Sequence, residues 1–172
     1  MIKRQFTAPA PDKVWTSDIT YIWTRQGWLY LSVFLDVFSR RIVGWAMKNR
    51  MTDQLVIDAF KQALAHRKAP PGLIVHSDRG SQYCSSFFKE LLDKAGFYQS
   101  MSSTGNCYDN AITESFFAIL KKEHEFHKRL ETRDEARTSI FKYIEMFYNR
   151  KRLHSSLGGL SPQQYEQSLI QA

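Results

Sequence analysis

Three acidic residues occupy positions where their carboxylates could do chemistry together. Asp18 lies in the middle of a predicted strand, Asp78 follows a short apolar run, and Glu114 lies near the start of a predicted helix. Residues 79 to 113, 35 positions, separate the last two. Carboxylates that converge at one sheet edge repel each other unless a cation is present, and hard divalent cations prefer carboxylate oxygens and water. The pattern therefore indicates metal-assisted chemistry that needs no protein nucleophile.

The stretch Asn106 to Lys122, NCYDNAITESFFAILKK, is typical of a turn that becomes a helix. Asp109 or Asn110 can cap this helix by accepting from free N–H groups of its first turn. Apolar residues recur on one face at helical spacing, namely Ile112, Phe116, Ile119 and Leu120. Glu114 lies off that face, and Lys121 points in almost the same direction seven residues later. We expect one edge of the helix to present a carboxylate and an ammonium group.

Three strands joined by short turns are predicted upstream, as in an antiparallel meander. They span residues 14–23, 28–35 and 41–47. In the first strand, alternation predicts that one face carries Trp15, Ile19, Tyr21 and Trp23 and the other Thr16, Asp18 and Thr20. We assign Trp23, Trp28 and Trp45 to the core or its rim and not to base stacking.

Helices and short strands then alternate. Thr52 is expected to cap a helix, residues 73–75 to form a parallel strand that ends at Asp78, and Ser85 or Ser86 to cap a helix closed by Gly96. Further elements are a short strand at 98–100, a long helix opened by the capping box Thr132-x-x-Glu135, and a short helix at 162–170. We therefore predict an α/β fold with a mixed sheet, three antiparallel strands followed by parallel strands, flanked by helices. The expected division is a basic arm (1–13), a core (14–149) and a basic tail (150–172).

The composition favours a polyanionic partner. The chain of 172 residues has a formal net charge of +7, which is typical of nucleic-acid binding, although charge for solubility alone is the alternative. No apolar run reaches membrane-spanning length and the N-terminus is too polar for a signal peptide, so we expect a cytoplasmic, nucleoid-associated protein without membrane contact. His124-x-x-His127 lacks a matching cysteine pair, and a solvated helix face is favoured over a zinc site.

Five sequence motifs, in this order, resemble a known family. WTSDITY, LDVFSRRIVGW, HSDRGSQY, DNAITESF and YNRKRLHSSLGGLSP together look like the DDE transposases of bacterial insertion sequences. They are most similar to the second-frame (OrfB) protein of the IS-three family, and hence to the retroviral integrase core. The resemblance covers roughly residues 15–165 and implies a ribonuclease-H-like fold. It also implies that Asp18, Asp78 and Glu114 are catalytic and hold two divalent ions, normally Mg²⁺ (or Mn²⁺).

The expected reaction is metal-dependent nicking of double-stranded DNA at element ends and transfer of the 3′-hydroxyl to target DNA. Two cations about 3.5–4 Å apart would stabilise charge on the attacking and leaving oxygens. Joining two ends argues for a homodimer or a higher homo-oligomer. Family members normally carry an upstream helix-turn-helix region, so we do not expect end recognition from these residues. The alternatives are a non-catalytic DNA-binding remnant and a ribonuclease-H-type nuclease.

Phosphate contacts are expected from basic residues near the carboxylates and after the long helix. These residues are Arg79, Lys121, Lys122, Arg150, Lys151 and Arg152. The alternative for Arg79 and Lys121 is salt bridges within the protein, and the alternative for the cluster after the long helix is a solvated helix end whose cations complement the helix dipole. Asp36 and Asp109 are rival carboxylates, but a turn role for Asp36 and a cap role for Asp109 are favoured over metal binding.

Overall fold

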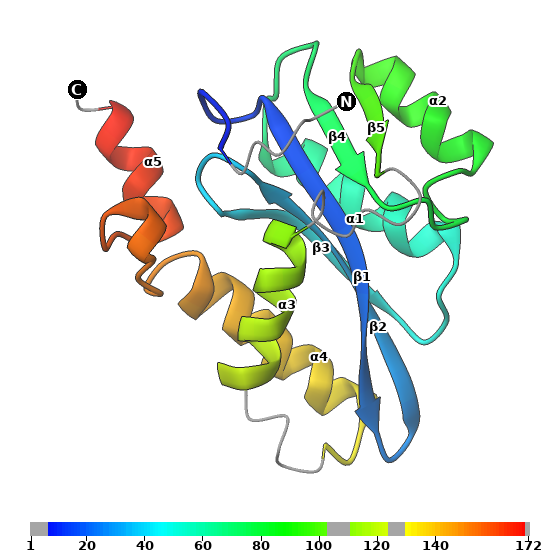
Figure 1. Cartoon of the computed structure of the whole chain (residues 1–172). Helices are drawn as coiled ribbons and strands as arrows, with labels where there is room; N and C mark the ends of the chain where they lie inside the picture. The colour runs from blue at the N-terminus through cyan, green and yellow to red at the C-terminus, as the bar shows by residue number, and fades with distance from the viewer. Residues whose placement is uncertain (1–6, 103–110, 124–129, 171–172) are drawn as a thin grey trace.

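A five-stranded mixed sheet lies at the centre of the protein. The computed structural model describes residues 7–102, 111–123 and 130–170, and its strand order is β3-β2-β1-β4-β5 (Figure 1). The strands are β1 (Val14–Thr24), β2 (Gly27–Asp36), β3 (Ile42–Lys48), β4 (Ile74–Ser77) and β5 (Tyr98–Met101). The first three pair antiparallel, whereas β4 pairs parallel with β1 and β5 parallel with β4. The predicted mixed sheet is therefore confirmed.

Helices cover both faces of this sheet. They are α1 (Asp53–His66), α2 (Ser86–Ala95), α3 (Ala111–Glu123), α4 (Arg133–Phe141), the π-helix η2 (Lys142–Tyr148), the 3₁₀ turn η3 (Ser155–Leu157) and α5 (Pro162–Ile170). α1 and α2 pack on one face and build the first core with buried residues of β1 to β4. α3, α4 and η2 pack on the other face and build the second core. The sheet thus forms the middle of three layers.

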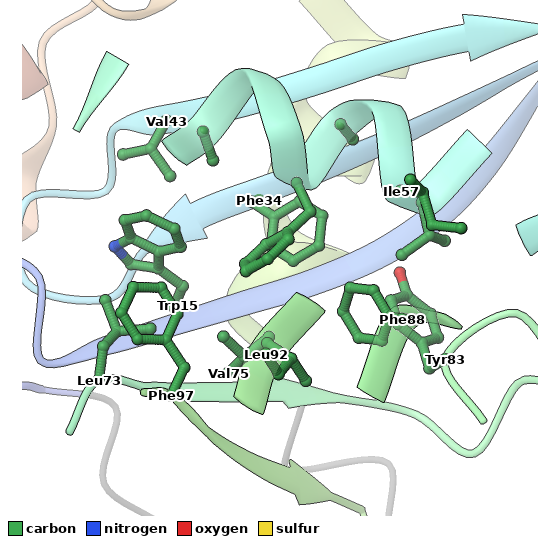
Figure 2. Packing of buried hydrophobic residues seen from close by; sticks show 14 residues of the cluster. Trp15, Phe34, Val43, Ile57, Leu73, Val75, Tyr83, Phe88, Leu92 and Phe97 are labelled. Atoms are coloured by element: carbon green, nitrogen blue, oxygen red, sulfur yellow. The ribbon is translucent and has the colours of Figure 1, made fainter. Parts of the chain in front are cut away.

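The first core is rich in aromatic side chains. Figure 2 shows Trp15 of β1 beside Phe97, and the Phe34 ring of β2 packs against Phe88 of α2 with 6.4 Å between the ring centroids. Helix α1 approaches β3 closely at Gly44, where an added Cβ would clash with the carbonyl oxygen of Ala59. The size of this residue therefore sets how closely α1 packs on the sheet, and any side chain there would push the two apart.

Most of the predicted helix ends are confirmed, but two differ. Ser85 accepts a hydrogen bond from the N–H of Phe88, and Thr132 forms the expected capping box. Thr52 occupies the N-cap position of α1, but its side chain makes no capping bond, so that prediction was wrong. The predicted long helix after Thr132 changes from α to π geometry at residue 142, and Phe147 in the π-helix is 41% exposed. Asp109 and Asn110 lie outside the described residues, as do His124 and His127.

The two faces of β1 are covered unevenly. Thr16 and Thr20, on the expected polar face, are buried because α3 and α4 lie on that side. Tyr21 and Trp23, on the opposite face, are 56% and 59% exposed, and Trp28 of β2 is 42% exposed. Trp23 and Trp28, assigned to the core or its rim, are therefore not part of the core, because strand alternation specifies a face but not how far the covering helices extend along it.

Arg67, at the end of α1, joins distant segments through a cluster of ion pairs. Its guanidinium contacts carboxylate oxygens of Asp12 at 2.9 Å, Glu166 at 2.9 Å and Asp36 at 3.5 Å. Asp36 is fully buried and also accepts from the N–H groups of Phe38 and Ser39, which confirms its predicted turn role. Through Glu166, helix α5, which lies at the periphery in Figure 1, is tied to the core.

Candidate active site

The pairing of β1 with β4 brings Asp18 and Asp78 to the same level of the sheet. The parallel pairing of the two strands ends at Thr16 and His76. Asp18 lies two residues after Thr16, and Asp78 lies two residues after His76. Asp18 is half-buried in the middle of β1, and Asp78 is exposed immediately after β4. Its carboxylate accepts a hydrogen bond of 2.9 Å from the N–H of Gly80, which fixes the turn after the strand.

Helix α3 places Glu114 beside this pair of strands. Thr113, fully buried, donates to the hydroxyl of Thr16 at 2.7 Å, which fastens the first turn of α3 to β1 two residues before Asp18. Phe116 and Leu120 anchor the same helix in the second core, as predicted, while Glu114 stays exposed. Three carboxylates from three elements are therefore held near one end of β4.

The electrostatics of Asp18 reflect this grouping. Its pKa is raised to about 6, mainly by burial; the negative charges of Asp78 and Glu114 add to the increase, and the N–H of Ile19 at 2.7 Å opposes it. A carboxyl group with such neighbours favours a proton or a cation close by. Among the residues that the structure describes, no three His, Cys, Asp or Glu side chains form a closed metal-binding group. The carboxylates of Asp18, Asp78 and Glu114 thus interact electrostatically but are not arranged as a complete set of metal ligands among the described residues.

Two residues that the sequence did not single out support the carboxylates. Tyr83, completely buried beneath them, shares a hydrogen bond of 2.8 Å with Ser17, next to Asp18. Burial raises the pKa of its phenol, so this side chain is a neutral hydrogen-bonding group at physiological pH. Thr113 is the second. Its position directly before Glu114 was the available signal, but sequence alone could not show that its hydroxyl reaches Thr16.

The basic residues near the carboxylates are only partly engaged within the protein. The Nε of Arg79 donates to the carbonyl oxygen of Ser102 at 2.9 Å, which orients its exposed side chain. Lys121 extends along the Glu114 edge of α3, and its Nζ lies 5.3 Å from the centre of the Tyr21 ring, a cation–π contact. Lys122 is exposed on the same turn.

The basic residues after η2 have different surroundings. Arg150 and Lys151 are exposed. Arg152 instead forms a bidentate salt bridge with Glu123 of α3, with its Nη2 2.6 Å from Oε1 and its Nε 2.8 Å from Oε2. The guanidinium of Arg152 therefore joins the C-terminal segment to the end of α3. The salt bridge with Glu123 competes with the DNA contact that was expected of Arg152.

Comparisons with known proteins identify the family of the chain. A family model described as integrase core domain matches residues 8–107, which contain Asp18 and Asp78, and a second model of that description matches residues 114–169, which begin at Glu114. The chain belongs to the integrase core family. The predicted family resemblance is confirmed.

Curated relatives of this integrase core domain are transposases. The chain is 53% identical to the transposase for insertion sequence element IS904 of Lactococcus lactis, over 96% of this chain and 66% of that protein. It is 48% identical to the transposase InsF for insertion sequence IS3A of Escherichia coli, over 96% of this chain and 58% of that protein. The chain therefore spans about three fifths to two thirds of the length of these relatives.

Solved structures with the same fold are retroviral integrase cores. The simian T-cell lymphotropic virus intasome chain matches with a TM-score of 0.76 at 20% identity, covering 93% of this chain and 56% of that one. The HTLV-2 integrase catalytic core domain, solved in complex with magnesium, matches with a TM-score of 0.71 at 20% identity, over 92% and 99%. The expected ribonuclease-H-like fold is thus confirmed. None of the described helices has the length and apolar character needed to cross a membrane.

Proposed function

We propose that this integrase core is the catalytic part of a DNA transposase. It would nick DNA at the ends of a mobile element and join the freed 3′-hydroxyl to target DNA. The observation that carries the proposal is the convergence of three carboxylates: the pairing of β1 with β4 brings Asp18 and Asp78 to one level of the sheet, and the Thr113–Thr16 hydrogen bond holds the first turn of α3, with Glu114, against β1. The transposase names of the relatives support the same reaction class.

The chemistry of these donors fits a divalent metal. Three carboxylates with a mutual repulsion are suited to hard cations such as Mg²⁺ or Mn²⁺. Asp18, Asp78 and Glu114 would hold two such ions, which supply Lewis-acid stabilisation of the charge on the attacking and leaving oxygens. Support comes from the HTLV-2 core, whose structure was solved with magnesium.

The chain's own side chains would position the DNA. Lys121 lies two helical turns from Glu114, roughly 10 Å along the helix, and can hold a neighbouring phosphate. Exposed Arg79, Lys122, Arg150 and Lys151 extend the basic surface on which double-stranded DNA would bind. Two ends must be processed together, so we propose a homodimer or larger homo-oligomer; the HTLV-2 core has been described in dimeric and trimeric forms.

The test is nicking of supercoiled plasmid DNA as a function of Mg²⁺ concentration. The wild-type protein should nick with saturable metal dependence, and Asp78→Asn should lose this activity while remaining folded. Asp93→Asn, an exposed aspartate of α2, is the matched control and should retain it. Undiminished nicking by Asp78→Asn would overturn the proposal.

A non-catalytic DNA-binding role is the second candidate. The observation in its favour is that the three side chains do not form a closed metal-binding group among the described residues. This role predicts DNA binding without saturable metal binding and without nicking at any Mg²⁺ or Mn²⁺ concentration. The same metal titration therefore separates the two candidates.

A further inference from the structure

An exposed aromatic patch lies on β1 and β2, three residues along β1 from the candidate metal-binding Asp18. We define it as Tyr21, Trp23 and Trp28, which are 56%, 59% and 42% exposed. The Trp28 ring packs against both others in an edge-to-face manner, with centroids 5.0 Å from Tyr21 and 4.8 Å from Trp23. Large aromatic side chains gathered in this way on a surface indicate a binding site.

The edge of β1 is open where this patch begins. Strand β4 pairs with β1 only over Val14–Thr16, so in the described part of the chain β4 does not cover the stretch that carries Asp18 and Tyr21. Their side chains point to opposite faces of the strand. Lys121 bridges the two faces, because it shares the α3 edge with Glu114 while its Nζ lies over the Tyr21 ring. A ligand passing across this open edge can therefore contact both the carboxylates and the patch.

Positive charge lies at both ends of the patch. Lys121 contacts Tyr21 at one end. At the other, Arg133 donates from its Nε to the carbonyl oxygen of Trp28 at 3.1 Å, and Arg25 lies in the turn after β1. Glu131, 3.2 Å from Arg25, is the acidic neighbour at that end. Aromatic rings flanked by cations match a nucleic-acid strand, whose bases stack and whose phosphates are anionic.

We propose that the Tyr21, Trp23 and Trp28 patch binds unpaired bases of a DNA strand whose reacting phosphate lies at Asp18 and Glu114. This inference rests on the proposed function. Three residues of β1 span about 10 Å, which corresponds to about three nucleotides at the roughly 3.4 Å axial spacing of one DNA strand. The patch would therefore hold bases a few nucleotides from the scissile phosphate and favour ends that open over a blunt duplex.

Tryptophan fluorescence tests this directly, because Trp15 is fully buried and Trp45 is half-buried, so Trp23 and Trp28 report on the surface. Without metal, a duplex with four unpaired thymidines at one end should quench the emission and protect it from acrylamide. The blunt duplex and a fork with abasic sites should do neither. Equal quenching by all three DNAs would overturn the proposal. The experiment uses only the wild-type protein, so misfolding of a variant cannot explain the result.

A matched pair of variants tests the stacking. Trp23→Leu keeps an apolar side chain but removes the ring, and it should weaken binding of the forked duplex by about 5- to 150-fold, the usual range for one stacked base. Binding of the blunt duplex should change less than twofold. Tyr98→Leu, on an aromatic residue 67% exposed on β5, should leave both affinities unchanged.

The alternative occupant is a second copy of the chain. Trp23→Leu could leave the preference for forked DNA intact but convert an oligomer to a monomer in light scattering. That result would assign the patch to self-association and overturn the proposal. If the wild-type protein nicks DNA in a Mg²⁺-dependent manner but does not prefer forked DNA, this inference alone is refuted. If nicking by the wild-type protein does not depend on metal, the proposed function is refuted instead.

Discussion

Replacement of Asp18 by Asn is expected to stabilise the protein in the absence of metal. Asn has nearly the same shape, and its side-chain oxygen can still accept from the N–H of Ile19. The substitution removes a half-buried charge that faces the charges of Asp78 and Glu114. A gain in stability from altering a candidate catalytic group is the signature of a site built for function at the expense of stability.

The size of the effect follows from the pKa of Asp18. Burial and the two neighbouring charges raise the pKa from 3.8 to about 6, and one pKa unit corresponds to about 1.4 kcal/mol. The charged form therefore costs up to about 3 kcal/mol of folding free energy at pH 7. A folded-state pKa above the unfolded one means that stability is highest below pH 3.8 and falls as pH rises through 6. The advantage of Asp18→Asn should thus appear above pH 4 and level off above pH 6.

Urea unfolding at pH 4 and pH 7, with EDTA and with 10 mM Mg²⁺, measures this effect. We expect Asp18→Asn to gain about 1–3 kcal/mol at pH 7 with EDTA, and Mg²⁺ to stabilise the wild type but not the variant. Asp58→Asn is the control, because its exposed pair with Lys48 at 2.8 Å predicts a loss of under about 1 kcal/mol. Lower stability of Asp18→Asn at pH 7 would refute the reasoning.

Three further substitutions have definite expectations. Arg67→Ala should cost about 3–5 kcal/mol in urea unfolding, because it leaves the carboxylates of its cluster without their shared cation; a loss under 1 kcal/mol would show that the cluster relaxes into water. Lys121→Ala should weaken DNA binding in a filter or anisotropy assay. It should cost less than about 1 kcal/mol of stability, because the contact it loses among the described residues is the exposed cation–π contact with Tyr21; unchanged DNA affinity would refute its phosphate role. Burial lowers the pKa of His154 to about 4 from 6.5, so wild-type stability should fall by up to about 3 kcal/mol relative to His154→Gln as pH drops from 6.5 to 4; parallel pH profiles of the two proteins would contradict it.

Local sequence signals predicted most of the fold. Short turns at Gly27 and after Asp36 dictated the antiparallel strands, and the caps at Ser85 and Thr132 act within one helical turn of their own position. Such features depend on neighbours in sequence, which is why pattern reasoning found them. The placement of Asp18 within β1, Asp78 directly after β4 and Glu114 in the first turn of α3 followed from the same local signals.

Features that depend on contacts between distant segments were missed. The pair of Arg152 with Glu123 and the cluster around Arg67 join residues far apart in sequence, so no local pattern announces them. The exposure of Trp23 depends on where α1 and α2 stop covering the sheet, which alternation along β1 does not encode. The change from α to π geometry after Phe141 belongs to the same class, since tertiary packing decides it.

Diffraction from crystals soaked in Mn²⁺ tests the central claim most directly, because anomalous scattering locates the metal without reference to activity. Metal drawn in by Asp18, Asp78 and Glu114 should appear as two anomalous peaks about 3.5–4 Å apart among these side chains, and both should vanish in crystals of Asp78→Asn. Peaks elsewhere, or none between these carboxylates at saturating Mn²⁺, would contradict the assignment of this site as the catalytic centre.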